Sequence, residues 1–369
     1  MFAVYRSLHR EAGGGERRAG TQFMKNAHIV GWGKALPHGR MTNEDLACMV
    51  DTSDAWIQER TGIQERRIAN ADETTLSLAI EASNNALISA GMVAAEIDLV
   101  IVCTATPEYL FPATACLVQD AIGAKHAGAF DLEAGCAGFI YGVSVANAMI
   151  GSGAAATVLV VGAETLSRIV DWNDRTTCVL LGDGAGACIL RGSDKPGGIL
   201  ATSLHSDGSG GDLIHMRGGG SRHPTTAKTV AADMHKLRMD GRQVYRFASR
   251  VLGEAVHSAV KKAGLVMDDV DLIIPHQANL RIIEAAAKMI GVPLNTMYVN
   301  IARHGNTSSA SIPLALCGAV EEGRVNVGDN LVFVGFGAGL TWGGCALKWT
   351  APIHGRLANA RGRQAAAGR

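Results

Sequence analysis

Short apolar runs recur in the same order in two parts of the chain. One run at residues 100–103 follows Asp98, and a similar run at 272–274 follows Asp271. In each part a helical stretch comes next and ends in an Ile-Gly pair. Apolar runs of this length predict buried strands, and the longer periodic stretches predict helices.

The two parts also share a turn of small residues. Gly135-Cys136 matches Gly305-Asn306, and after a further helical stretch the apolar run 157–162 matches 330–335. Each part therefore has the order strand, helix, strand-to-turn, helix, strand, which predicts a parallel sheet covered by helices. If the parts pack around a pseudo-twofold axis, Cys136 and Asn306 face each other across one cleft. Two long units argue against a solenoid.

Capping signals and periodicity predict the remaining elements. Thr42 and Asp45 have the spacing of a capping box at the start of a helix. We further expect a strand at 27–33, helices beginning near 51–56 and covering 74–90 and 243–263, and an irregular excursion within 196–240.

These elements form two halves of one body, which we place at residues 24–195 and 196–349 with no flexible linker between them. Residues 1–23 contain several arginines and a glycine run but no apolar core, so they are not a secretory signal, and we expect a disordered extension. Residues 350–369 are basic and rich in Ala, Gly and Arg, which predicts a disordered tail.

Composition narrows the class of protein. The 369 residues are 47% hydrophobic, and 34 Lys and Arg balance 34 Asp and Glu, so nothing indicates a nucleic-acid partner. No apolar run has the length of a membrane span, and we expect no membrane association. The eight cysteines are scattered without a C-x-x-C pair, which is typical of reduced thiols in the cytoplasm. The histidines lack ligand spacing, so we expect no metal or other cofactor.

Cys136 carries the strongest chemical signal. It lies between the tail of a predicted strand and an apolar helical stretch. The unpaired N–H groups and positive dipole of a first helical turn would lower the thiol pKa, and the sequence therefore predicts a nucleophile with a depressed pKa.

His276 and Asn306 are the candidate partners of this thiol. One interpretation is a papain-like Cys/His/Asn set, in which the histidine deprotonates the cysteine. The repeat favours another, in which both side chains point N–H donors at an enolate oxygen formed by decarboxylation. Cys136 would then hold an acyl group as a thioester. Two glycine strings, 182–186 and 335–339, lack the dinucleotide-binding fingerprint.

Over residues 24–349 the chain resembles β-ketoacyl-acyl carrier protein synthase III, the initiating condensing enzyme of bacterial type II fatty acid synthesis. Seven strings carry the resemblance in the same order, and they occupy residues 51–57, 60–63, 135–139, 181–186, 275–279, 305–308 and 336–339.

The resemblance implies a thiolase-like α/β fold with two pseudo-twofold αβ halves in five αβαβα layers. It implies a decarboxylative Claisen condensation between an acyl-CoA primer, such as acetyl-CoA or a short or branched acyl-CoA, and malonyl-acyl carrier protein. The product would be a 3-oxoacyl-acyl carrier protein, made by a homodimer with no cofactor beyond the coenzyme A thioester.

The resemblance also assigns catalytic roles. Cys136 would be the acylated nucleophile, and His276 and Asn306 the decarboxylation pair. The backbone N–H groups of Cys136 and Ala338 would form the oxyanion hole. The family commonly has glycine at the position of Ala338, but alanine keeps the backbone donor.

Binding roles follow from the same resemblance. Trp56 and Arg175 would enclose the adenine of coenzyme A, Arg60 would contact a phosphate, and Met239 and Gly241 would line the pantetheine tunnel.

Four further residues would contact protein partners. Phe111 would reach into the acyl pocket of a second subunit, and Arg246, Arg281 and Lys288 would meet the acidic carrier protein.

Three alternatives remain at this level. A degradative thiolase needs a second catalytic cysteine in the glycine loop, whereas residues 335–339 contain none and Cys345 lies beyond them. A condensing enzyme of secondary metabolism would use the same three side chains, and a non-catalytic scaffold would not need all of them. Primer length depends on packing around Phe111, Leu180 and Tyr245, which the sequence does not determine.

Overall fold

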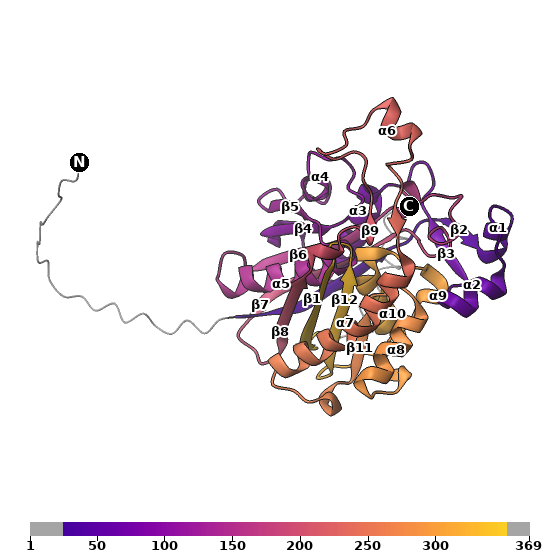
Figure 1. Ribbon diagram of the computed structural model, residues 1–369. Helices are drawn as coiled ribbons and strands as arrows, with labels where there is room; N and C mark the ends of the chain where they lie inside the picture. The colour runs from indigo at the N-terminus through magenta and orange to yellow at the C-terminus, as the bar shows by residue number, and fades with distance from the viewer. Residues whose placement is uncertain (1–24, 353–369) are drawn as a thin grey trace, which may run out of the picture.

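Five strands form a mixed sheet from the first half of the repeat. In the computed structural model, which describes residues 25–352, their order is β1-β7-β6-β4-β5 (Figure 1). β4 runs parallel to β5 and β6, whereas β7 is antiparallel to β1 and β6. The strands are β1 (Asn26–Ala35), β4 (Leu99–Cys103), β5 (Gly128–Leu132), β6 (Thr157–Glu164) and β7 (Gly184–Ser193).

A four-stranded sheet of order β11-β12-β13-β8 comes from the second half. Only β11 and β12 are parallel, so the expectation of a purely parallel sheet is wrong. The three residues between β12 and β13 are too few for a parallel crossover, and the chain therefore returns as a hairpin. The strands are β8 (Gly198–Ser206), β11 (Leu272–Pro275), β12 (Asn330–Gly337) and β13 (Thr341–Lys348).

Helices between and outside the sheets complete the five αβαβα layers, as predicted. α5 (Gly138–Gly151) and α10 (Ser311–Glu321) lie between the sheets and contact strands of both. α3 (Thr75–Ala90) and α4 (Thr114–Ala121) cover the outer face of the first sheet. α7 (Gly241–Lys262) and α8 (Leu280–Ile290) cover the outer face of the second.

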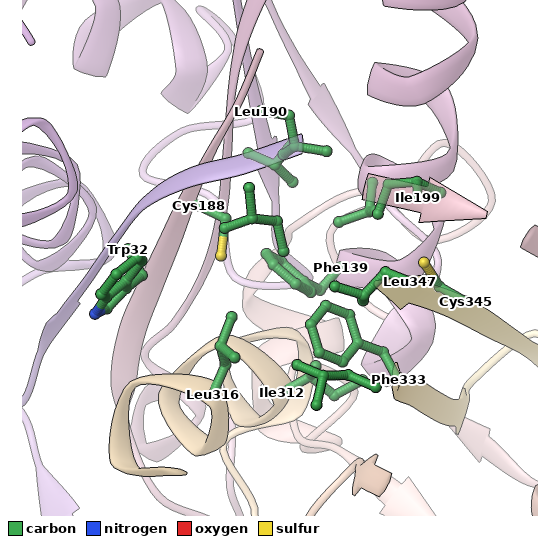
Figure 2. Close-up of a cluster of buried hydrophobic side chains, with 14 of the residues drawn as sticks. Trp32, Phe139, Cys188, Leu190, Ile199, Ile312, Leu316, Phe333, Cys345 and Leu347 are labelled. Atoms are coloured by element: carbon green, nitrogen blue, oxygen red, sulfur yellow. The ribbon is translucent and has the colours of Figure 1, made fainter. Parts of the chain in front are cut away.

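The middle layer is held by a continuous apolar core. Phe139 of α5 and Phe333 of β12 lie side by side in this core (Figure 2), with 6.4 Å between their ring centroids. Trp32 of β1 packs against Trp349 with 5.3 Å between their ring centroids. Aromatic and aliphatic burial on this scale is the main force that joins the halves.

The predicted caps determine where several helices begin and end. Thr42 accepts a hydrogen bond from the Asp45 N–H and Asp45 bonds back, so α1 (Asn43–Ala47) begins with the expected capping box. α2 (Asp54–Thr61) begins at the cap Ser53 and ends at Gly62, whose φ of 77° suits glycine. α1 and α2, with the two-stranded antiparallel sheet of β2 (Gly39–Thr42) and β3 (Glu65–Ile68), lie together at one side of the molecule (Figure 1).

The irregular excursion after β8 is confirmed. It contains α6 (Ala227–Ala231) and a two-stranded ribbon of β9 (Ile214–His215) and β10 (Arg238–Met239). α9 (Ile301–His304) is a single turn immediately before Asn306.

The packed body extends beyond Trp349, where we had placed its end. Ala351 is buried, and the Thr350 hydroxyl lies 2.8 Å from Nδ1 of His28. The predicted disordered segments at 1–23 and beyond Pro352 lie outside the described residues. Within residues 25–352, no helix is long and apolar enough to cross a membrane.

Candidate active site

Cys136, His276 and Asn306 line one cavity of about 660 Å³. The cysteine comes from the first half of the repeat and the other two from the second, as the sequence predicted. Trp56, Met239, Tyr245 and the two arginines Arg246 and Arg281 are among the other residues that surround the cavity.

Cys136 lies in a 3₁₀ turn, Gly135–Ala137, immediately before α5 rather than inside its first turn. The backbone of the other half approaches this turn closely. A Cβ at Gly337 would overlap the Cys136 nitrogen, and one at Gly135 would lie 2.7 Å from the Ala338 nitrogen. The N–H groups of Cys136 and Ala338 therefore come close together, as an oxyanion hole requires.

The expected depression of the Cys136 pKa is wrong. Burial raises the pKa of the thiol to about 12, although a hydrogen bond from the Ser308 side chain opposes the shift. Desolvation of a thiolate outweighs the few backbone dipoles of a short 3₁₀ turn. Cys136 is therefore a neutral thiol at physiological pH.

His276 directly follows β11, and both its backbone and its ring contact neighbouring residues. Its backbone N–H donates to the Val334 carbonyl at 2.8 Å, and its ring packs edge-to-face on Phe336 with 5.4 Å between centroids. Nδ1 lies 2.6 Å from Oγ of Ser311. Burial lowers the pKa of His276 to about 3, so the ring is neutral at physiological pH.

Asn306 is fixed through its backbone and its side-chain oxygen. Its N–H donates to the Leu180 carbonyl at 2.8 Å, and its carbonyl accepts from Gly182 N–H at 2.9 Å. Oδ1 accepts the Ser308 N–H at 2.8 Å. The amide NH₂ is therefore the end that remains to donate into the cavity.

The coenzyme A residues that we predicted lie around Trp56. The guanidinium carbons of Arg60 and Arg175 lie 5.1 and 5.3 Å from the Trp56 ring centroid. Arg175 does not line the cavity, and its Nη1 donates to the Asp51 carbonyl at 2.6 Å. Met239 and Gly241 line the wall of the cavity.

The residues predicted to meet protein partners are more dispersed. Arg246 and Arg281 border the cavity, and Arg281 also lies over the Tyr245 ring, 5.7 Å from its centroid. Lys288 lies in the last turn of α8 and outside the cavity. Phe111 also lies outside it, and its side chain is 85% exposed.

Sequence reasoning missed three polar residues behind the site, Ser308, Ser311 and Glu164. Ser308 has an unusual φ of 48° in the turn after Asn306. Glu164 ends the otherwise apolar strand β6 and is fully buried. A carboxylate at the carboxyl end of an apolar strand was the available signal. Ser311 had no signal beyond its position shortly after Asn306.

Comparison with known proteins identifies the family. Sequence models of 3-oxoacyl-[acyl-carrier-protein (ACP)] synthase III match residues 130–208, and the model of its C-terminal part matches residues 260–349. The β-ketoacyl-[acyl-carrier-protein] synthase III of Desulfitobacterium hafniense is 50% identical over 327 residues, which are 89% of this chain and 99% of the relative. This chain belongs to the 3-oxoacyl-[acyl-carrier-protein] synthase III family.

Solved structures agree with the family in fold. The 3-oxoacyl-[acyl-carrier-protein] synthase III of Aquifex aeolicus superimposes with a TM-score of 0.82 at 45% identity, over 88% of this chain and all of that one. A priming β-ketosynthase of the R1128 polyketide pathway gives a TM-score of 0.83 at 38% identity, over 89% and 98% of the two chains. Membership of the synthase III family excludes a papain-like protease and a dinucleotide-binding enzyme, while the role of His276 stays a prediction.

The raised pKa of Cys136 leads to a prediction about how its alkylation rate depends on pH. Only the thiolate reacts with iodoacetamide, so alkylation of Cys136 should accelerate about tenfold per pH unit from about pH 7 to about pH 10 without a plateau. Peptide-resolved mass spectrometry measures this rate separately from that of the exposed Cys48 and Cys116. A plateau below about pH 9 would show that the site favours the thiolate after all.

Proposed function

We propose that this protein condenses an acyl-CoA primer with malonyl-acyl carrier protein and releases a 3-oxoacyl-acyl carrier protein. The observation that supports this most directly is the set of one thiol and two uncharged N–H donors in a single cavity. The Desulfitobacterium and Aquifex proteins carry this activity in their names. The reaction requires no cofactor beyond the thioesters, and we place it in the cytoplasm.

In the first step the primer is transferred to Cys136. The sulfur attacks the thioester carbonyl, whose oxygen receives hydrogen bonds from the N–H groups of Cys136 and Ala338. The bond to the coenzyme A sulfur breaks, and coenzyme A leaves as a thiol with the proton lost by Cys136. Trp56, Arg60 and Arg175 hold the nucleotide end of coenzyme A.

In the second step malonyl-acyl carrier protein loses CO₂. The electrons of the broken carbon–carbon bond enter the thioester carbonyl, and the resulting enolate oxygen accepts hydrogen bonds from His276 and Asn306. The enolate carbon then attacks the acyl group on Cys136. The carbon–sulfur bond breaks, and the cysteine takes up a proton to become a thiol again.

A second candidate is the priming condensation of a polyketide pathway. The similarity to the R1128 priming β-ketosynthase favours it, because that protein shares the fold at 38% identity. Both functions use the same three side chains and differ in the primer that the cavity admits. Intact-mass analysis after exposure to acetyl-CoA, isobutyryl-CoA and longer acyl-CoAs distinguishes them by which acyl group loads Cys136.

The division of labour between the three side chains can be tested by half-reactions. His276→Ala and Asn306→Ala should still load an acyl group on Cys136, while malonyl decarboxylation falls by about 10²-fold or more per donor. Intact mass measures loading, and CO₂ release measures decarboxylation. Equal loss of both half-reactions would favour His276 as the base for the thiol. Cys136→Ser is the control that should lose loading altogether.

We propose that the carrier protein docks on Arg246, Arg281 and Lys288. Arg281→Glu should raise the apparent KM for malonyl-acyl carrier protein and leave acyl-CoA loading unchanged. Added salt should have the same effect on the parent enzyme, because exposed charges are screened beyond about 8–10 Å. Lys261→Glu is the matched control, because Lys261 lies in the last turn of α7 and does not line the cavity. Equal responses of Arg281→Glu and Lys261→Glu would exclude this docking site.

We also propose a homodimer in which Phe111 closes the partner's acyl pocket. Tyr109, Leu110 and Phe111 form an apolar loop with exposed fractions of 57, 82 and 85%. Such a loop usually contacts a partner surface. The loop follows β4, and the neighbouring strand β5 forms one edge of the five-stranded sheet within the described chain. Phe130 of β5 is 38% exposed, so an apolar side chain is also accessible at this edge.

Phe111→Ala should then admit longer primers without slowing malonyl decarboxylation. Mixed dimers of Cys136→Ser subunits and Phe111→Ala subunits locate the effect. Their live Cys136 faces a normal Phe111 only if the loop crosses over, so they should keep the parent primer length. If the mixed dimers accept longer primers, the loop serves its own subunit.

A further inference from the structure

We propose that Ser311 is a positioning residue that keeps the proton of the His276 ring on Nε2. The proposal deepens the function proposed above and rests on His276 as a decarboxylation donor. It also decides between the two roles that the sequence left open for this histidine, because a ring nitrogen that carries a proton can donate to an enolate but cannot accept the proton of a thiol.

The hydrogen bonds around Ser311 give the direction of its hydroxyl. Ser311 is the first residue of α10 and only 2% exposed. Its Oγ accepts the backbone N–H of Gln277 at 3.4 Å and lies 2.6 Å from Nδ1 of His276. Within residues 25–352, Nδ1 of His276 is the acceptor atom that lies within hydrogen-bond distance of the Ser311 hydroxyl. The hydroxyl therefore donates to Nδ1.

A neutral imidazole that accepts at Nδ1 carries its proton on Nε2. The contact with Ser311 and the edge-to-face packing on Phe336 both hold the ring in this orientation. Since His276 lines the cavity, the Nε2–H group is available there as an uncharged donor.

One short segment thereby orients both donors. Asn306 holds its amide through the Ser308 N–H, and five residues later Ser311 holds the His276 ring. At metal sites, partners that fix the tautomer and direction of a ligating histidine in this way are worth about 10–100-fold in activity, and we expect a similar effect for Ser311.

Ser311→Ala tests the proposal through the half-reactions. Loading of Cys136 by acyl-CoA should be unchanged, while malonyl decarboxylation falls on the order of 10-fold or more. Ser83→Ala, which removes another buried hydroxyl bonded to the Ala79 carbonyl, should leave both half-reactions intact. Thermal denaturation of each variant monitors the fold. Unchanged decarboxylation in a folded Ser311→Ala protein would overturn the proposal.

A double variant separates positioning from a general structural effect. If Ser311 acts through His276, the protein with both His276→Ala and Ser311→Ala should decarboxylate no more slowly than His276→Ala alone. Multiplied losses would show that Ser311 acts apart from the ring and would reject the inference.

Nuclear magnetic resonance reads the tautomer directly. In protein labelled with ¹³C and ¹⁵N histidine, the His276 signals, assigned by their loss in His276→Gln, should show the proton on Nε2. In Ser311→Ala the Nδ1–H form should appear. A parent enzyme with the proton on Nδ1 would overturn the inference without any activity measurement. If His276→Ala instead leaves decarboxylation intact, the proposed function fails, while this spectrum still judges Ser311.

Discussion

The buried carboxylate of Glu164 is the interaction on which the relative placement of the two halves depends. It receives hydrogen bonds from the backbone of Ala105 and the hydroxyl of Thr106, both just beyond β4, and from Ser309 in the turn after Asn306. Burial raises its pKa, and these bonds oppose the shift. Because donors from both halves converge on this carboxyl group, any movement would leave a buried polar group unsatisfied, and the distance between the halves is therefore fixed.

That constraint explains why the site can be built from backbone as much as from side chains. Glu164 holds the turn that carries Asn306 against the first half, and α5 follows the turn that carries Cys136. Gly337 then lets the second half approach the cysteine nitrogen without a side chain between them. The N–H groups that we propose for the oxyanion hole are positioned by these main-chain approaches, so their geometry depends on the whole interface between the halves rather than on one flexible side chain.

The sequence predicted what depends on local pattern and failed where solvation or three-dimensional neighbours decide. The repeat gave the strands, the helices and the pairing of Cys136 with Asn306 across one cavity, and a capping box located α1. The sequence could not predict the pKa of the Cys136 thiol, because it shows where a helix begins but not how far the thiol is desolvated. The sequence pattern predicted a parallel sheet, but the connection after β12 is so short that β13 returns antiparallel in a hairpin. Glu164 and Ser311 contact residues distant in sequence, so their roles become visible only in the folded chain.

Cys136, His276 and Asn306 are all uncharged, and this determines how the cavity responds to pH. With a thiol pKa near 12, a histidine pKa near 3 and an amide, the three residues keep the same charges from weakly acidic to strongly alkaline solution. The cations Arg60, Arg242, Arg246 and Arg281 line other parts of the same cavity. The cavity thus combines cations, whose effect depends on ionic strength, with three side chains whose charges stay constant over a wide range of pH. A change in the internal pH of a cell would leave the charges of these three side chains the same.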